Sequence, residues 1–169
     1  MRGFQLWINL PAREKMKKPA YRDIQPDEIP VVALAGGGRV KVIAGALAVD
    51  GGSSPGPIQG LTTDPLYFDI ELPAGATFSH PVKADHNAFV YPYEGAVSVA
   101  GQTIPSRQAG VLGEGSAVQI EAGPDGARMI LVAGKPLGEP VVQYGPFVMN
   151  SREQIEQALA DYPDGTLTG

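Results

Sequence analysis

The sequence predicts an all-β domain that ends in a single α-helix, and three observations support this prediction. Apolar and polar residues alternate with a period of two in several short segments, most clearly from residue 66 to residue 72, as in half-buried β-strands. Turn-forming residues separate these segments, with 22 glycines and 16 prolines among the 169 residues. The period changes to that of an amphipathic helix near the C-terminus, over residues 151–163.

The chain begins with a segment that alternates as a strand does. In residues 3–11, the apolar residues Phe4, Leu6 and Ile8 are separated by single intervening residues, so we expect an opening strand there. Residues 12–20 are rich in lysine and arginine, and we interpret this basic loop as a solvated linker.

The next two predicted strands span residues 29–34 and 39–48. Three consecutive glycines, residues 36–38, lie between them. Because no helical pattern follows these glycines, they indicate a hairpin turn rather than a phosphate-binding loop. Residues 50–60 are rich in Gly, Ser and Pro, and we expect them to form a long flexible loop.

The stretch from residue 66 to residue 101 organises the rest of the chain. We expect a strand at residues 66–72, a turn at Gly75, a loop that holds both histidines, a second strand, a turn at Gly95 and a third strand before Gly101. The glycines stand where the backbone must turn sharply.

Four more short strands are predicted in the second half of the chain, at residues 102–104, 109–112, 117–121 and 128–133. Strands at a spacing of roughly ten residues are typical of a sandwich or a small barrel. Residues 136–146 show no regular pattern.

The C-terminal segment carries the signals of a capped helix. Ser151 and Gln154 have the spacing of a capping box, and Pro163 ends the pattern. The residues expected on the buried face of this helix are Ile155, Ala158, Leu159 and Tyr162. The predicted organisation is therefore a barrel over residues 1–150, a helix over residues 151–163 and a tail over residues 164–169.

Composition excludes several classes of function. A net charge of −5 gives no reason to expect direct binding of nucleic acid. The absence of cysteine excludes disulfides and iron–sulfur clusters. No apolar run reaches the roughly 18 residues that span a bilayer, and the first residues do not resemble a signal peptide. We therefore predict a cytoplasmic protein without a membrane partner.

Several segments resemble the pirin family. They are GFQLWINLP (residues 3–11), LGEG (112–115), AGKPL (133–137), EPV (139–141) and GPFVMN (145–150). The resemblance implies a cupin-type β-barrel of jelly-roll-like antiparallel sheets, and specifically the carboxy-terminal half of a two-cupin protein. Pirins are iron-binding cupins associated with the ring-opening dioxygenation of flavonols such as quercetin and with transcriptional co-regulation.

The resemblance also implies where the metal of the family lies. The ligands, three histidines and a glutamate, belong to the amino-terminal cupin, upstream of the segment that resembles residues 3–11. The resemblance therefore implies Fe(II) for the full-length family and no cofactor in this chain, because no residue here inherits a ligand position.

The histidines of this chain have poor spacing for a metal site of their own. His80 and His86 are six residues apart, and a straight strand would separate them by about 20 Å, whereas non-haem iron needs converging ligands. We expect His80 to be exposed at the entry of a strand, and His86 to order the loop together with Asn87. In the alternative, the loop folds back and His80, His86 and Glu94 hold a metal.

Aromatic residues suggest a ligand pocket as a further hypothesis. Tyr67, Tyr91, Tyr93 and Glu94 would line the mouth of the barrel and bind a small molecule there. In the alternative interpretation, alternating aromatic residues belong to the core or form cross-strand pairs.

Two functions from different classes follow from these observations. The chain either acts as a metal-free structural or interaction half, or contributes to an iron-dependent quercetin 2,3-dioxygenase-like activity that needs the amino-terminal cupin. Loss of that cupin would leave apolar surface on the opening strand, and such surfaces are covered by association. We therefore expect a protein partner, either a second copy in a homodimer or an amino-terminal cupin.

Overall fold

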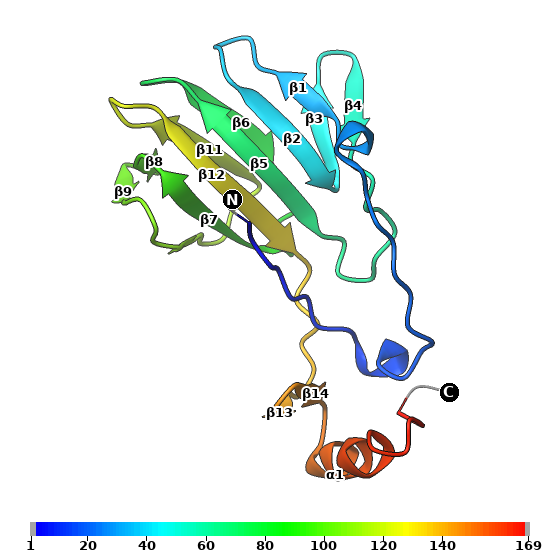
Figure 1. Cartoon of the computed structure of the whole chain (residues 1–169). Coiled ribbons are helices and arrows are strands. Elements are labelled where there is room, and N and C mark those ends of the chain that lie inside the picture. The colour runs from blue at the N-terminus through cyan, green and yellow to red at the C-terminus, as the bar shows by residue number, and fades with distance from the viewer. Residues whose placement is uncertain (1–2, 168–169) are drawn as a thin grey trace. The chain divides into compact units, whose positions relative to one another are not determined.

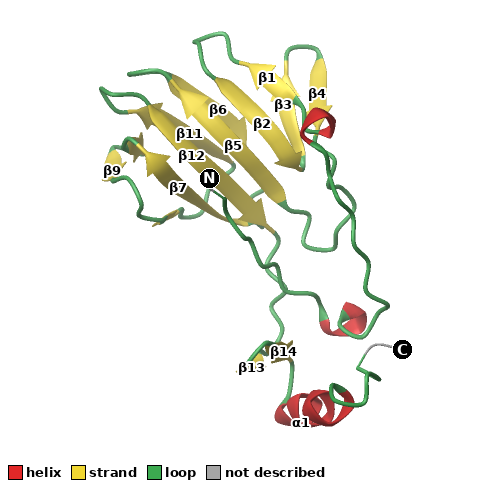
Figure 2. Ribbon diagram, in the orientation of Figure 1, coloured by secondary structure: helices red, strands yellow, loops and turns green. Residues whose placement is uncertain are grey.

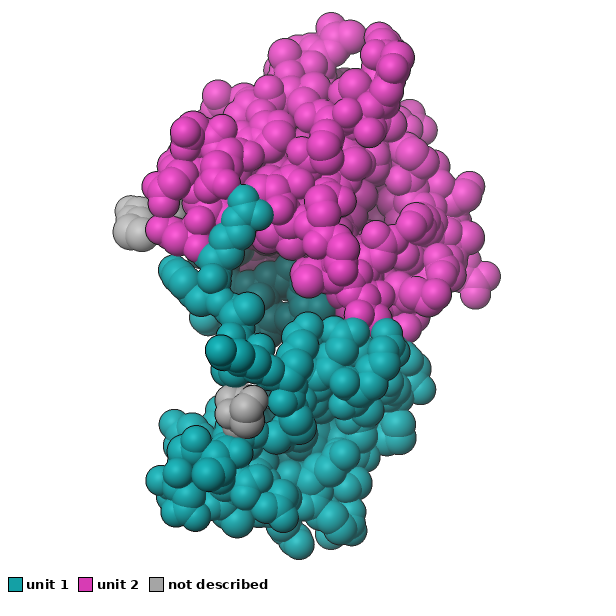
Figure 3. All heavy atoms as spheres, turned by 90° about the vertical axis from the view of Figure 1, so that its right-hand side faces the viewer, with its two compact units in different colours: residues 1–22, 137–169 teal, residues 23–136 magenta. Residues whose placement is uncertain are grey.

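The computed structural model describes residues 3–167 and divides into two compact units, drawn in different colours in Figure 3. One unit spans residues 23–136. The other is formed by the chain up to residue 22 together with the chain from residue 137 onward. This division differs from the predicted barrel of residues 1–150, because the strands of the two sheets begin at Val31 and end at Gly134.

Two antiparallel sheets dominate the unit of residues 23–136 (Figures 1 and 2). The larger sheet has the strand order β1 (Val31–Ala33), β2 (Arg39–Ala44), β5 (Leu66–Leu72), β12 (Ala127–Gly134), β7 (Asn87–Glu94) and β10 (Gly110–Val111). The smaller sheet has the order β6 (Thr77–Pro81), β11 (Ala117–Ala122), β8 (Val97–Val99) and β9 (Gln102–Ile104). The unit also contains the short 3-10 helix η2 (Pro26–Glu28). These sheets confirm the predicted all-β class.

The hydrophobic core takes its side chains from both sheets. Alternate residues of β5 are buried, so that Phe68, Ile70 and Leu72 belong to the core. On β11 the same alternation buries Val118 and Ile120. The period-2 pattern of the sequence therefore identifies the inner face of each of these strands.

Strand β12 holds the larger sheet together, because it pairs along its length with both β5 and β7. Leu131 lies opposite Phe68 on one side and opposite Val90 on the other, and all three side chains are fully buried. The pairing with β7 shifts register between Arg128 and Met129, which marks a β-bulge.

The predicted opening strand is wrong, because residues 3–11 form no strand in the structure. Alternation of apolar and polar residues gives a segment one apolar face. A strand also needs a neighbouring strand whose backbone groups form hydrogen bonds with its own N–H and C=O groups. Burial does not alternate here either, since the adjacent side chains of Trp7 and Ile8 are 72% and 43% exposed. The segment continues into the short 3-10 helix η1 (Ala12–Glu14).

A hairpin replaces the loop expected at residues 50–60. Strand β3 (Ala46–Val49) pairs with β4 (Gly52–Pro55) through an Asp50-Gly51 turn, a dipeptide that favours tight hairpins. The strand expected over residues 39–48 is divided at Gly45, whose φ of 75° interrupts the extended backbone. A Cβ on Gly45 would lie 3.1 Å from the carbonyl oxygen of Pro65, so the chain turns where only glycine fits easily.

Strand β6 is a further element that the sequence prediction missed. The sequence predicts a loop at these residues, yet they form five consecutive pairs with β11. Phe78 and His80 are the two buried residues of this strand. His80 therefore continues the inward face set by Phe78, rather than marking a loop.

The second unit contains a hairpin, a helix and the N-terminal segment. The hairpin of β13 (Val142–Tyr144) and β14 (Phe147–Met149) lies in a region where no regular structure was predicted up to residue 146. Within this unit, the Ala12 backbone N–H donates to Glu139 Oε2 at 2.7 Å, and Asn150 Nδ2 donates to the same oxygen at 3.1 Å. Glu139 thus ties the N-terminal segment to the residues that precede the helix.

The helix α1 (Arg152–Asp161) confirms the C-terminal prediction. The Gln154 backbone N–H donates to Ser151 Oγ at 3.3 Å, and the Gln154 side chain accepts from the Ser151 backbone, so both halves of the capping box are formed. Only half of the expected face is buried, since Ile155 and Ala158 are buried whereas Leu159 and Tyr162 are 43% and 65% exposed. None of the helices within residues 3–167 is long and apolar enough to cross a membrane.

Candidate functional site: two separated histidines and a cleft in the barrel

His80 is buried in the core and not exposed as predicted. Only 4% of the residue is exposed, and its ring meets the ring of Phe68 edge-on at 5.0 Å and lies nearly parallel to that of Phe78 at 6.2 Å. Its Nδ1 atom has no hydrogen-bond partner among residues 3–167. This burial in apolar surroundings lowers the pKa of His80, because the charged imidazolium would lose its hydration.

The lowered pKa predicts a specific loss of stability in acid. In the unfolded chain His80 is protonated near the ordinary histidine pKa of about 6.5, whereas in the folded chain it is protonated only at a lower pH. We therefore expect the free energy of unfolding to fall as the pH decreases below that value. The variant His80→Leu should show a flatter pH dependence than the wild type in urea titrations. Equal slopes for His80→Leu and the wild type would contradict a buried neutral His80.

His86 belongs to a separate cluster of charged groups. Its Nε2 atom lies 3.5 Å from Asp64 Oδ2 and 3.8 Å from Asp85 Oδ1, and 6% of its side chain is exposed. Lys83 hydrogen-bonds Asp64, and Lys135 lies 3.5 Å from Asp85. The hydrogen bond from Lys83 lowers the pKa of Asp64, so this carboxylate stays charged beside the imidazole.

The structure does not bring His80, His86 and Glu94 together as a metal site. Within residues 3–167 no group of three His, Cys, Asp or Glu side chains has an arrangement that could hold a metal ion. His80 faces phenylalanine rings, the two carboxylates beside His86 are each paired with a lysine, and Glu94 lies 3.5 Å from the Arg128 guanidinium. The iron that the family resemblance implies therefore does not fit these residues, because they offer no converging set of oxygen and nitrogen ligands.

The tyrosines expected at the mouth of the barrel lie on the outer face of the larger sheet instead. In β5 and β7 the residues next to Tyr67 and Tyr91 are the buried ones, so alternation directs these tyrosines away from the core. Tyr91 pairs with Ile130, and Tyr67 pairs with Val132, across the central strand. This arrangement agrees with the alternative of cross-strand pairs.

Charged residues join the tyrosines on this outer face. Tyr93 donates its hydroxyl hydrogen to Asp69 Oδ1 at 2.7 Å, and burial together with this hydrogen bond raises the pKa of Tyr93. Glu71 accepts from Arg39 at 2.7 Å and lies 3.2 Å from Arg128, which also approaches Glu94. The hydrogen bond from Arg39 is the main reason that the pKa of Glu71 is lowered. These hydrogen bonds and ion pairs link the side chains of the adjacent strands β2, β5, β12 and β7.

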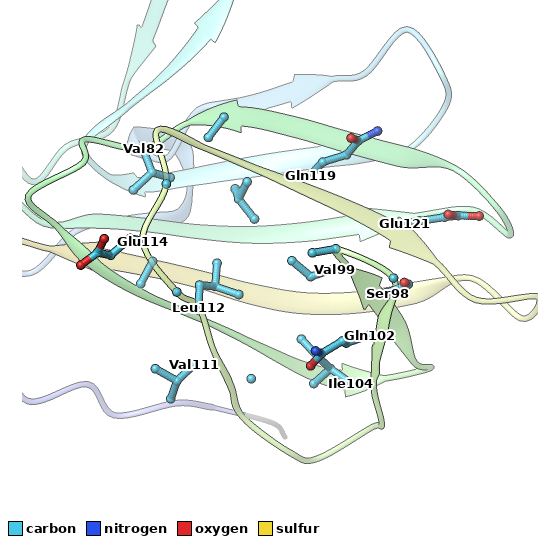
Figure 4. Close-up of a pocket in the computed structure, with 18 of the residues that line it drawn as sticks. Val82, Ser98, Val99, Gln102, Ile104, Val111, Leu112, Glu114, Gln119 and Glu121 are labelled. Carbon is cyan, nitrogen blue, oxygen red and sulfur yellow. The ribbon is translucent and has the colours of Figure 1, made fainter.

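A cleft of about 640 Å³ opens into the side of the barrel, and we call it the side cleft (Figure 4). It lies between β11, the β8–β9 hairpin, and the segment of residues 110–115 that contains β10. Its volume lies within the range of small-molecule pockets. The residues that line it are Val82, His86, Ala88, Ser98, Val99, Ala100, Gly101, Gln102, Ile104, Gly110, Val111, Leu112, Gly113, Glu114, Gly115, Ala117, Val118, Gln119 and Glu121.

Of the predicted site residues, only His86 lines the side cleft. Sequence reasoning missed the others because they are mostly small or aliphatic and come from separate strands. The one available signal was the Gly113-Glu114-Gly115 segment, which contributed to the family resemblance.

Comparison with known proteins relates the whole chain to one family. Residues 67–168 match the family model of the pirin C-terminal cupin domain. A pirin-like protein of Caulobacter vibrioides is 50% identical over 98% of this chain and 58% of its own length. Human pirin is 40% identical over 95% of this chain and 55% of its own length.

A solved structure gives the same relation in three dimensions. The crystal structure of a quercetin 2,3-dioxygenase from Acinetobacter baumannii superimposes with a TM-score of 0.84 at 30% identity, covering 95% of this chain and 55% of the other. The chain thus spans little more than half the length of these relatives. The predicted cupin β-fold is confirmed by this similarity, and the chain belongs to the pirin family, in which it corresponds to the C-terminal cupin domain.

Proposed function

We propose that this chain is an interaction half of a pirin, a metal-free cupin that associates with a second copy of itself through the apolar side chains of residues 4–10. The observation that carries the proposal is the exposure of this segment. Trp7 is 72% exposed, and Phe4, Ile8 and Leu10 are 46%, 43% and 36% exposed. Exposed aromatic and aliphatic side chains of this kind are typical of protein–protein interfaces.

The arrangement of titratable groups supports the metal-free part of this proposal. The two histidines lie in different surroundings, one among phenylalanine rings and the other among paired charges. Within residues 3–167 no group of three such side chains is arranged to hold a metal ion, and the two carboxylates beside His86 are each paired with a lysine. In this proposal the barrel gives a stable scaffold and the N-terminal segment gives the contact.

Trp7 offers a direct test, because it is the only tryptophan of the chain. We expect sedimentation velocity to show a monomer–dimer equilibrium, and the tryptophan emission to shift to shorter wavelength as the protein concentration rises. The variant Trp7→Ser should weaken the dimer at least tenfold, about 1.4 kcal/mol or more, since a buried tryptophan is a common hot spot.

A matched control separates this effect from a general loss of surface aromatics. Tyr21 belongs to the same unit and is 91% exposed, so Tyr21→Ser should leave the dimer unchanged. A monomer at high protein concentration would remove self-association from the proposal. If the monomer instead bound a separately produced amino-terminal cupin of a relative, that cupin would be the partner.

The second candidate function is a quercetin 2,3-dioxygenase-like activity in which this chain supplies the carboxy-terminal half. The similarity to the Acinetobacter baumannii enzyme favours it. In that case this chain alone should show no oxygenase activity with quercetin. Addition of an amino-terminal cupin that carries iron should restore turnover.

A further inference from the structure

The side cleft has the construction of a ligand site rather than of a surface irregularity. Its inner wall is apolar and includes Val82, Ala88, Leu112 and Val118, of which Ala88 and Val118 are 9% and 3% exposed. Polar groups lie around this apolar wall. Small-molecule sites in proteins combine an apolar wall with a few polar groups in the same way.

The backbone leaves the cleft open for identifiable reasons. Strand β8 pairs with β11 only over residues 120–122, so the first half of β11 is not covered by β8. The next segment along the rim is rich in glycine, and a Cβ on Gly113 would find no atom within 4 Å. The entrance therefore results from a short strand and a loop with little side-chain bulk.

The charged side chains that line the cleft are mainly negative. Glu114 and Glu121 are its two carboxylates, and Figure 4 shows them at opposite ends with Leu112 and Val99 between them. Neither glutamate lies within ion-pair distance of a basic group in the described part of the chain. His86 is the one basic side chain among the lining residues. Such a site attracts cations and repels carboxylates and phosphates.

We propose that the side cleft binds a small amphipathic cation, with its apolar body against the wall that contains Val82, Leu112 and Val118 and its ammonium group beside Glu114. Burial of a hydrocarbon or aromatic body against the apolar wall is energetically favourable. Glu114 is placed next to this wall by the same segment that carries Leu112, so one ligand of modest size meets both. This site is independent of the self-association proposed above, because it uses no residue of the N-terminal segment.

Three molecules that share one apolar body test the charge preference. We would titrate the full chain with tryptamine, tryptophol and indole-3-propionate, which carry a cationic, a neutral and an anionic head on an indole ring, and follow backbone amide shifts by NMR. Shifts are expected at residues 98–104 and 110–119. Tryptamine should bind tightest and indole-3-propionate weakest. Salt at about 0.5 M should weaken tryptamine selectively, because screening acts on the charged head.

Variants then locate the site. Glu114→Gln should weaken tryptamine about fivefold, as for an exposed ion pair of about 1 kcal/mol, and leave tryptophol unchanged. Glu156→Gln, which removes an exposed carboxylate from α1, is the matched control and should change neither ligand. Ala88→Val adds bulk at the wall and should weaken tryptamine and tryptophol alike, with a thermal melt to show that the variant is folded.

Three results would overturn the proposal. They are equal affinity for tryptamine and indole-3-propionate, amide shifts confined to the outer face of the larger sheet, and an unchanged affinity of Glu114→Gln for tryptamine. The last result does not depend on the folding of the Ala88→Val variant, so the proposal stays falsifiable even if that variant unfolds.

Discussion

Replacement of Gly95 by alanine is expected to lower the free energy of unfolding by about 3 kcal/mol. Gly95 turns the chain between β7 and β8 with a φ of 68°, and a Cβ there would lie 2.1 Å from the carbonyl oxygen of Gly126. The obstacle is backbone, so no flexible side chain can move aside. The turn that holds Gly126 is itself fixed, since the backbone N–H of Gly123 donates to the Ala96 carbonyl at 2.9 Å.

Gly75 is the matched control for this substitution. Its φ of 66° is almost the same, but a Cβ there would meet no atom within 4 Å. Gly75→Ala should therefore lower the free energy of unfolding by only about 1 kcal/mol, the cost of a Cβ in the left-handed backbone region. Urea unfolding of the two variants measures the difference directly. Equal losses would show that backbone conformation, and not the contact between the two turns, makes glycine necessary at position 95.

Truncation of Phe68 to alanine should lower the free energy of unfolding by about 4 kcal/mol. Phe68 is fully buried, it belongs to β5, and it lies opposite Leu131 of the central strand while its ring meets the ring of His80. Its loss leaves a cavity between the two sheets. Water that enters this cavity would also hydrate the imidazole, so the acid-induced loss of stability assigned to His80 should become smaller.

A second phenylalanine serves as the comparison. Phe89 lies on the outer face of the same sheet and is only partly buried, so Phe89→Ala should cost less than half as much. It should also leave the pH dependence unchanged. A loss at Phe68→Ala of about 1 kcal/mol or less, measured by urea unfolding, would contradict a packed core at this position.

The sequence predicted the strands that have a clean period of two and glycine at their ends. Strands β5 and β7 and the later strands are examples, because in a half-buried sheet the pattern and the structure obey the same geometry. The capped helix was predicted for a similar reason, since Ser151 and Gln154 act within one turn and depend on no distant partner.

The errors arose where the outcome depends on distant parts of the chain. Residues 3–11 alternate like a strand, but pairing needs a neighbour that a local pattern does not reveal. The opposite error concerned β6, in which His80 looks polar in the sequence but is buried because β11 pairs beside it. In each case tertiary context decided the outcome.

The candidate site was less predictable than the fold. Tyr67, Tyr91 and Tyr93 were predicted to line a pocket because they are aromatic. In the structure they alternate with the buried residues of β5 and β7 and therefore point outward. The side cleft is lined instead by small and aliphatic residues such as Ala88 and Val118, which resemble ordinary core positions in a sequence. Its opening is set by strand lengths, which short sequence patterns define only to within a few residues.

Iron(II) titration of the full chain, prepared without a histidine tag, tests the central claim that this half holds no metal of its own. The proposal predicts less than roughly a tenth of an equivalent of iron by elemental analysis and no binding on titration, because a metal centre needs converging ligands. The described histidines and carboxylates do not provide such a set. Binding of about one equivalent that is lost in His86→Ala would contradict the account and would make the cluster around His86 the metal site.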